Sequence, residues 1–378
     1  MKQRLFVTLS LAGLAMSTFG ATKPKTAIKS LNKTTIQQPT YTEWHDLQVN
    51  AINRFPLHTN FFTYPADDWV SEKDGKIVSK DILHMNKAES KYFLSLDGTW
   101  KFNWVANADQ RPTDFYKEDL DDSKWKTMNL PGIWEMNGFG DPEYVNVGFG
   151  WRGHFDQQPP AVPTKDNHVG SYRRIIDIPA NWDGKQVVAH FGSVTSNIYL
   201  YVNGKFAGYA EDSKVAAEFD ITPYLKKGKN LIAFQTFRWC DGSWDEDQDF
   251  WRLSGVARES YLFARDAQLH LEDIRVTPDL VNNYKDGVLN ISAKVKGTGK
   301  LNFILFDKEG KQVTTATGLA KNGTANITMN VENPHKWNAE TPYLYTLQVS
   351  LSSALKNGNM KSASMTPVKV GFRKVEIK

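Results

Sequence analysis

The sequence has little of several features that would assign it to a familiar class. It contains a single cysteine, Cys240, among 378 residues, so no internal disulfide forms. Lys and Arg number 46 against 42 Asp and Glu, and the net charge of +4 selects neither nucleic acid nor an anionic membrane as partner. There is no Gly-Xaa-Ser-Xaa-Gly elbow, glycine-rich phosphate loop or dinucleotide fingerprint, and the histidines lack the close spacing of zinc ligands.

The N-terminus carries the features of an exported protein. Lys2 and Arg4 precede an apolar run from Leu5 to Ala15, and small residues follow as far as Ala21. Because the run is too short to cross a bilayer, these flanks predict a secretory signal peptide over residues 1–21. Its removal leaves a mature charge of about +2. Residues 22–40 are predicted to be a flexible leader, and the single cysteine fits an oxidising periplasm.

Short apolar runs punctuated by Gly, Pro, Asn and Asp indicate an all-β protein of two domains. Residues 41–264 are predicted to form a jelly-roll sandwich. Its clearest element is a hairpin in which Asn203-Gly204, a dipeptide that tolerates positive φ angles, joins strands at 197–202 and 206–210. Residues 265–378 are predicted to form an immunoglobulin-like sandwich, with strands at 268–276, 288–295, 301–307, 324–331, 343–351 and 368–377.

The run from Arg238 to Gly255 is the densest group of charged and aromatic residues. Since Arg238 and Arg252 can each bind a carboxylate bidentately, we interpret it as a structural loop held by ion pairs. A direct catalytic role is the second interpretation. A calcium loop is disfavoured because alternating oxygen ligands and a closing Glu are missing. The residues assigned to this loop are Arg238, Asp241, Glu246, Asp247, Asp249, Trp251 and Arg252.

Aromatic residues are abundant, with 12 Trp, 14 Tyr and 21 Phe, and this surplus hints at surfaces that stack on sugars. Rings at 144–152 flank Asn146, whose amide can both donate to and accept from hydroxyls. Asp212 follows the predicted hairpin and can accept two hydroxyl protons or cap a turn. Both segments are candidates for sugar binding, and for each an ordinary turn is the alternative.

Read together, these motifs resemble glycoside hydrolase family 2, and more narrowly its large bacterial β-galactosidases. The most specific are the run from Arg238 to Gly255 and Leu94-Ser-Leu-Asp-Gly-Thr-Trp-Lys-Phe102. The resemblance covers residues 41 to 378. Further matching segments are Trp44, Asn53-Arg54, Leu130-Pro-Gly-Ile-Trp-Glu-Met136, Tyr144-Val-Asn-Val147, Val202-Asn-Gly204, Gly208-Tyr209, Glu211-Asp-Ser213, Val331-Glu-Asn-Pro334, Lys336-Trp337 and Val370-Gly-Phe-Arg373.

This resemblance implies roles for individual residues. Asn146 and Asp212 match residues that bind hydroxyls of the terminal galactose, and Val147 matches a neighbour that lines the same pocket. Asp212 also matches a residue beside a sodium ion. The run 238–255 is implied to brace the pocket. Magnesium and sodium are implied for the complete enzyme, which is expected to be a homo-oligomer. Two departures are Gly148-Phe-Gly-Trp-Arg152, where the best-known members have a Thr-Tyr-Pro-Ile type of sequence, and Cys240, where a Ser is usual.

The resemblance further implies that the catalytic domain is missing from this chain. Retaining glycosidases use two carboxylates about 5 Å apart. The family carries both as Glu on a TIM barrel, a fold of typically about 250 residues. In the family, Val370-Gly-Phe-Arg373 immediately precedes the barrel, and five residues follow it here. We therefore predict no catalytic residue, an inactive chain, and a barrel in the same or a separate chain as its partner.

The predicted function is that of the N-terminal, non-catalytic portion of a secreted retaining β-galactosidase, which supplies one wall of the galactose pocket. A free-standing carbohydrate-binding module is the alternative from another class. A subunit that docks a separately encoded barrel is a third reading. Within the family, β-glucuronidase and β-mannosidase compete as the activity of the complete enzyme.

Overall fold

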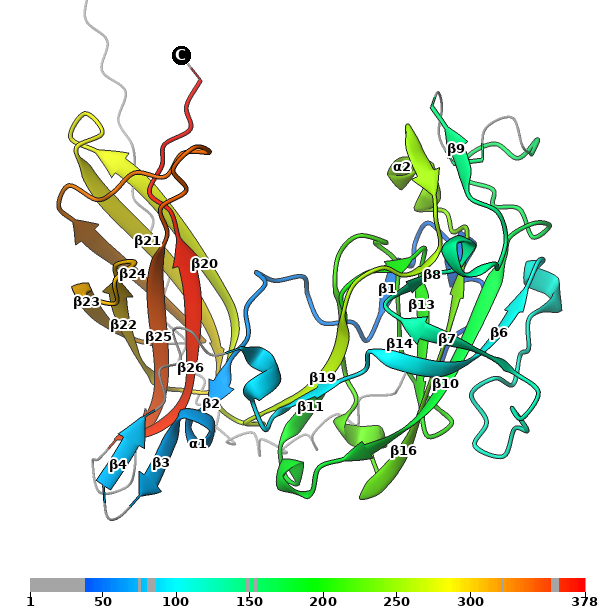
Figure 1. The fold of residues 1–378 in the computed structure, drawn as a ribbon, viewed down its shortest axis with the longest axis horizontal. Helices are drawn as coiled ribbons and strands as arrows, with labels where there is room; N and C mark the ends of the chain where they lie inside the picture. The colour runs from blue at the N-terminus through cyan, green and yellow to red at the C-terminus, as the bar shows by residue number, and fades with distance from the viewer. Residues whose placement is uncertain are drawn as a thin grey trace, which may run out of the picture. The chain divides into compact units, whose positions relative to one another are not determined.

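The computed structural model describes residues 38–73, 76–79, 86–146, 150–151, 155–320, 323–354 and 360–377. The signal peptide and most of the leader predicted above lie outside these residues. Strands dominate the described part and assemble into packed antiparallel sheets, which confirms the all-β prediction (Figure 1). No helix among the described residues is long and apolar enough to cross a membrane.

The first sandwich pairs a seven-stranded sheet of order β1-β14-β13-β16-β10-β6-β7 with a four-stranded sheet of order β15-β11-β19-β5. The strands of the larger sheet are β1 (Ala51–Ile52), β6 (Gly98–Val105), β7 (Lys126–Leu130), β10 (Val169–Ile178), β13 (Ile198–Val202), β14 (Lys205–Ala210) and β16 (Gly228–Phe237). Those of the smaller sheet are β5 (Phe93–Ser95), β11 (Gln186–Phe191), β15 (Ala217–Asp220) and β19 (Ser260–Arg265).

Short elements complete this part of the chain. A three-stranded sheet contains β8 (Gly132–Ile133), β12 (Val194–Thr195) and β18 (Gly255–Val256), and β9 (Glu143–Val145) pairs with β17 (Phe250–Arg252). A separate hairpin consists of β3 (Val70–Lys73) and β4 (Lys76–Ser79). The helices are α1 (Ala66–Trp69), α2 (Ser243–Glu246) and the 3-10 turns η1 (Glu43–His45), η2 (Lys87–Glu89), η3 (Ala108–Gln110), η4 (Glu135–Asn137), η5 (Ala180–Trp182) and η6 (Thr222–Tyr224).

The second sandwich pairs a five-stranded sheet of order β2-β26-β25-β22-β23 with a three-stranded sheet of order β20-β21-β24. Alternate residues of β21 are buried, as expected for a strand with one face in a core. Side chains of both sheets share one hydrophobic core. The strands are β2 (Tyr64–Pro65), β20 (His270–Val281), β21 (Asp286–Lys296), β22 (Lys300–Phe306), β23 (Gln312–Leu319), β24 (Thr324–Val331), β25 (Tyr345–Ala354) and β26 (Met360–Val370).

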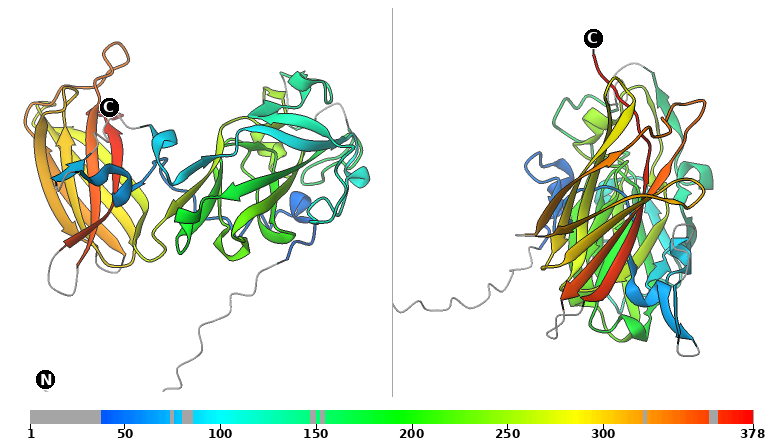
Figure 2. Two further views of the ribbon diagram at one scale, coloured as in Figure 1. Left: turned by 60° about the horizontal axis from the view of Figure 1, so that its bottom comes forward. Right: turned by 90° about the vertical axis from the view of Figure 1, so that its left-hand side faces the viewer.

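Three features of the second sandwich differ from the sequence-based prediction. The last strand is β26, Met360–Val370, rather than residues 368–377, because its polar first half is held by the ladder to β25 and needs no apolar pattern. Strand β23 was not predicted, since it is a largely exposed edge strand. Tyr64–Pro65 falls in the range predicted for the jelly roll, yet it pairs with β26 (Figure 2).

Many of the aromatic residues lie in the cores, so the surplus as a whole is not a sugar-stacking surface. The rings of Tyr172 and Phe234 stack at 4.3 Å between centroids, and the Trp134 indole donates to the Tyr172 hydroxyl at 2.5 Å. Each buried ring removes roughly 150–250 Å² from water, so these residues supply much of the stability. Among the tryptophans whose burial the structure describes, six are buried: Trp44, Trp100, Trp134, Trp151, Trp182 and Trp239.

The β13–β14 hairpin forms as predicted, with φ of 49° at Asn203 and 77° at Gly204. The structure adds a second role for Asn203, whose side chain is buried. Its amide nitrogen donates to Tyr224 O and to Asn230 Oδ1, each at 2.8 Å, and its oxygen accepts from Leu231 N at 2.9 Å. The turn residue therefore also joins the hairpin to β16.

A buried cluster of two histidines and a glutamate holds the segment that follows β1. Glu218 on β15 accepts from His190 Nδ1 at 2.8 Å and from His58 Nε2 at 3.0 Å. Burial alone would raise the pKa of Glu218, but the hydrogen bonds from His190 and His58 outweigh it and lower the pKa to about 2. The Glu218 hydrogen bond raises the pKa of His58. His190, predicted to be a satisfied core histidine, is confirmed as one.

Asn203→Ala is expected to destabilise the protein by about 2–4 kcal/mol, because alanine tolerates a positive φ poorly and leaves buried partners unpaired. Asn283→Ala is the matched control, since Asn283 also has a positive φ, of 56°, but is exposed. The control is expected to cost about 1 kcal/mol. Urea denaturation measures both free energies of unfolding, and equal losses would contradict the role of the buried hydrogen bonds.

Glu218→Gln is expected to lower the free energy of unfolding by about 2–3 kcal/mol near pH 5.5. The contribution of Glu218 is present above its unfolded pKa of about 4.3 and is lost as the pH falls toward its folded value of about 2. That of His58, whose pKa is raised, is present below about pH 6.5 and is lost as the pH rises. Urea denaturation at pH 3, 5.5 and 8 checks this, with Glu332→Gln at an exposed position as the control. If wild type and Glu218→Gln differ in free energy of unfolding by the same amount at all three pH values, the assignment is refuted.

Candidate functional site

Asp212 lies in the loop that joins β14 to β15. The backbone leaves the sheet where Glu211 N donates to Asn50 O at 3.0 Å, and it turns sharply at Asp212, whose φ is 75°. Val215 N then donates to Asp212 O at 3.0 Å and closes the turn. Asp212 therefore occupies a fixed turn at the end of a central hairpin.

The Asp212 carboxylate is held by an ion pair. Its Oδ2 accepts from Arg54 Nη1 at 2.6 Å, and the side chains of Arg54 and Asp212 are 13% and 39% exposed. Arg54 is itself anchored, because it forms an antiparallel bridge to Phe219. The largely buried guanidinium fixes the carboxylate, while the partial exposure of Asp212 leaves room for a ligand.

Asn146, the second predicted sugar ligand, is exposed and directly follows β9. Strand β9 is held against β17, with Val145 opposite Phe250 and Tyr144 opposite Trp251. The Tyr144 hydroxyl also donates to Asp249 Oδ1 at 2.8 Å. Val147, the third predicted ligand, lies outside the described residues.

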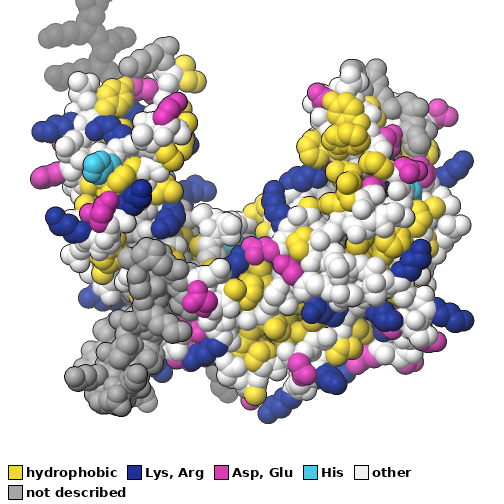
Figure 3. Space-filling view, viewed as in Figure 1, with side chains coloured by type: hydrophobic (Ala, Val, Ile, Leu, Met, Phe, Trp, Pro, Cys, Tyr) yellow, Lys and Arg dark blue, Asp and Glu magenta, His cyan; other side chains and the backbone are white. Residues whose placement is uncertain are grey.

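Two exposed rings, those of Tyr144 and Trp251, lie opposite each other beside Asn146, and we call them the β9–β17 aromatic surface. Both are about half exposed, and their rings lie 5.3 Å apart. Phe250 is also about half exposed, but it pairs with Val145 and so points to the other face of the two strands. Figure 3 shows hydrophobic side chains gathered at this end of the first sandwich. Lys214 Nζ lies 5.3 Å from the centre of the Phe250 ring. Since Lys214 belongs to the Asp212 loop, this contact joins the two candidate segments.

The run 238–255 is folded, but not through the internal ion pairs that we predicted. Arg238 pairs with Glu143 of β9 at 3.0 Å. Arg252 donates to the main-chain oxygens of Gly150, at 2.8 Å, and of Phe250, at 2.7 Å. Both guanidiniums are buried, and the fold offers them partners from distant segments and main-chain oxygens rather than the carboxylates next to them in sequence.

The carboxylates of the run have different surroundings. Glu246 accepts from Ser213 N at 3.0 Å, so the run contacts the residue that follows Asp212. Asp249 accepts from Tyr144, as described above. Burial raises the pKa of Asp247 to about 6, although Arg252 and Lys214 oppose this shift. These contacts attach the run to both candidate sugar-binding segments.

Glu211 is a buried residue of the matching segment 211–213 to which no role was assigned above. It points into the protein beside Cys240 and Asp241, and the Tyr209 hydroxyl donates to it. Burial raises the pKa of Glu211 to about 9, and the nearby Asp241 adds to the shift. Its position next to Asp212 was the only available signal, because the groups that surround it come from elsewhere in the chain.

Comparison with known families assigns both sandwiches. The family described as "Glycosyl hydrolases family 2, sugar binding domain" matches residues 93–266. The family described as "Glycosyl hydrolases family 2" matches residues 269–373.

Curated relatives carry the same two domains. The chain is 36% identical over 351 residues to a β-galactosidase of Priestia megaterium, a match that covers 89% of this chain and 32% of the relative. A β-galactosidase of Halalkalibacterium halodurans is 35% identical, with 88% and 31% covered. A β-galactosidase large subunit of Leuconostoc lactis is 31% identical, with 88% and 52% covered. The chain thus spans about a third to a half of these relatives and matches their N-terminal part.

Solved structures share the fold at low sequence identity. A β-glucuronidase of Bifidobacterium dentium superimposes with a TM-score of 0.62 at 18% identity, covering 76% of this chain and 49% of that one. A β-glycosidase of Bacteroides vulgatus gives a TM-score of 0.57 at 22% identity, with 75% and 34% covered. Both domain matches, the relatives and this shared fold lead to one conclusion: the chain belongs to glycosyl hydrolase family 2 and comprises its sugar-binding and immunoglobulin-like domains.

Proposed function

We propose that this chain is the N-terminal portion of a secreted retaining β-galactosidase and that Asp212 and Asn146 form one wall of its galactose pocket. The observation that carries the proposal is the Asp212 carboxylate, which is fixed by Arg54 and yet accessible. The curated relatives that are 31–37% identical to this chain are β-galactosidases, which favours a galactoside as substrate.

The chemistry of the two segments suits a sugar. A fixed carboxylate accepts hydrogen bonds from two neighbouring hydroxyls, and a carboxamide both donates and accepts. The β9–β17 aromatic surface lies directly beside Asn146 and offers apolar ring faces for a pyranose. Asp212, Asn146 and these rings together supply the polar and apolar contacts that orient a monosaccharide.

Hydrolysis itself we assign to the part of the relatives that this chain does not match. A retaining mechanism needs two carboxylates about 5 Å apart, one as nucleophile and one as acid and base. Asp212 is paired with Arg54 and serves binding in this proposal. The role of the chain is therefore to bind and orient the substrate, and a catalytic barrel in the same or a separate chain supplies the reacting groups.

The metals implied by the resemblance fit this chain only in part. Asp212 binds Arg54 through Oδ2, so its second carboxylate oxygen is the one available as a sodium ligand. Hard cations need several oxygen ligands, and in this proposal the others, like those of magnesium, come from the catalytic portion. A bound sodium would supply positive charge that orients sugar hydroxyls.

Export to the periplasm and assembly into a homo-oligomer complete the proposal. The basic and apolar pattern of residues 1–21 supports export. N-terminal sequencing of the mature protein from a periplasmic fraction would test it, and a mature protein that keeps Lys2 and Arg4 would refute it.

A free-standing sugar-binding module is the second candidate, favoured by the exposed rings of the β9–β17 aromatic surface. The two readings differ in affinity, because half of a pocket forms too few contacts to offset the cost of association. A subunit that docks a separate barrel is compatible with the names of two relatives, each called a β-galactosidase large subunit. Pull-down from the source cell would reveal such a partner.

The purified chain is expected to show no hydrolysis of a chromogenic β-galactoside and to bind galactose or lactose more weakly than about 1 mM. Enzyme assay and calorimetry measure the two properties. Turnover abolished by Asp212→Ala would overturn the non-catalytic assignment. Tighter binding without turnover would favour the free-standing module.

In an enzyme that joins this chain to a family 2 catalytic portion, Asp212→Asn and Asn146→Ala are each expected to lower kcat/KM by about 10- to 1000-fold, since each removes hydrogen bonds to substrate hydroxyls. Asn338→Ala, at an exposed position of the second sandwich, is the control and should leave kcat/KM unchanged. Steady-state kinetics with a galactoside decide the matter. Unchanged kcat/KM in both site variants would contradict the placement of the pocket wall.

A further inference from the structure

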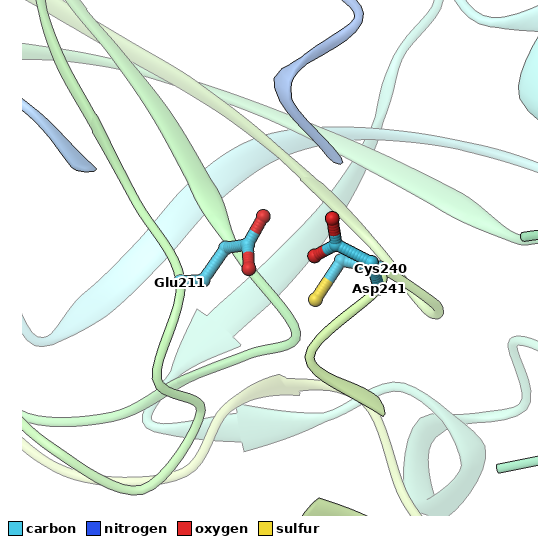
Figure 4. Close-up of side chains that lie close together, drawn as sticks. All are labelled: Glu211, Cys240 and Asp241. Atoms are coloured by element: carbon cyan, nitrogen blue, oxygen red, sulfur yellow. The ribbon is translucent and has the colours of Figure 1, made fainter. Parts of the chain in front are cut away.

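A second cluster of chemically reactive side chains lies on the inner side of the Asp212 loop. Glu211 follows β14, and Cys240 and Asp241 follow β16. One ligand atom from each of the three lies within 4.8 Å of the others, and all three residues are buried, with exposures of 7%, 0% and 6%. Figure 4 shows the three side chains directed into the same space.

Among the described residues, no basic side chain forms an ion pair with this cluster. Asp241 Oδ2 is buried and accepts no hydrogen bond. Glu211 accepts one, from the Tyr209 hydroxyl. Of the basic residues on adjoining segments, Arg54 is paired with Asp212 and Arg238 with Glu143. Because a buried carboxylate without a partner is costly, the cluster must hold either a proton or a cation.

A glycine lies directly beside the cluster. A Cβ atom placed on Gly242 would lie 3.4 Å from Glu211 Oε2, 3.5 Å from Cys240 Sγ and 4.0 Å from Glu246 Oε1. Gly242 therefore places no side chain among these three donor atoms. Glu246 is thus a further donor beside the three-residue cluster.

We propose that Glu211, Cys240 and Asp241 bind a divalent metal ion, and that the donor set selects zinc. A thiolate with carboxylates suits a borderline ion, whereas magnesium and calcium take oxygen ligands alone. Zinc lies about 2.3 Å from sulfur and about 2.0–2.2 Å from oxygen, so the side chains must draw together by roughly 1 Å on binding. Glu246 or a water would complete four ligands.

The ion would have a structural role distinct from sugar binding. It would tie the end of β14 to the end of β16 and so stiffen the loop that carries Asp212. Asp212 is not among the three residues whose ligand atoms lie close together, and its carboxylate pairs with Arg54. The metal site therefore does not depend on the proposed galactoside pocket.

The test uses the full chain after dialysis against a chelator, with zinc chloride as the probe. Calorimetry and elemental analysis are expected to show one zinc per chain. Cys240→Ser and Asp241→Asn are each expected to weaken zinc binding by roughly tenfold or more. Asp245→Asn, an exposed carboxylate in the same loop, is the matched control and should bind as the wild type does.

Cobalt substitution covers the case in which a variant does not fold. Wild-type protein loaded with Co²⁺ is expected to show the thiolate-to-cobalt charge-transfer absorption, which only a cysteine ligand gives and which Cys240 alone can supply. Absence of this band, or of stoichiometric zinc, overturns the proposal and leaves a proton shared between the two carboxylates as the explanation. Zinc binding by Cys240→Ser and Asp241→Asn as tight as that of the wild type also overturns it.

Discussion

The first sandwich depends on the hydrogen-bonded ladder of β16, which pairs with β10 along one edge and with β13 along the other. Its residues Asn230 to Phe237 are all buried, so a shift of register by one residue would exchange two packed faces at once. The strand leads directly into Arg238, Cys240 and Asp241. Through β13 it also aligns β14, whose end carries Glu211 and Asp212. The register of these central strands thus decides where every charged group of the candidate site lies.

The charged groups at these strand ends are compensated in contrasting ways. Asp212 and Glu143 each face a buried guanidinium, and Glu246 accepts from a main-chain N–H. Glu211 and Asp241 share a buried space and face each other. The adjacent residues Glu211 and Asp212 therefore have different surroundings. The partly exposed carboxylate of Asp212 suits a sugar, and the buried carboxylate of Glu211 suits a cation. This division follows from the backbone turn at Asp212, where φ is positive.

Much of the fold could be predicted because local patterns carry it. Asn203-Gly204 specifies its own turn, since few other residues adopt two successive positive φ angles. The alternation of apolar and polar residues in β21 reports its one buried face. Strand β23 and the first half of β26 were not predicted, and one cause explains both. They are held by main-chain hydrogen bonds to a neighbouring strand, and such bonds leave no trace in the order of side chains.

By itself, the sequence determined the all-β class, the two sandwiches, the family, and the identity of Asp212 and Asn146 as candidate ligands, because each depends on residues close together in the chain or on recognisable motifs. Only the tertiary structure decided the partners. Arg54 and Asp212 are 158 residues apart and Arg238 and Glu143 are 95 apart, and no spacing rule joins them. No spacing rule predicts the buried cluster of Glu211 with Cys240 and Asp241 either. Charged groups pair according to their distance in space. Residues far apart in the chain come close only when the strands that carry them pair in the correct register.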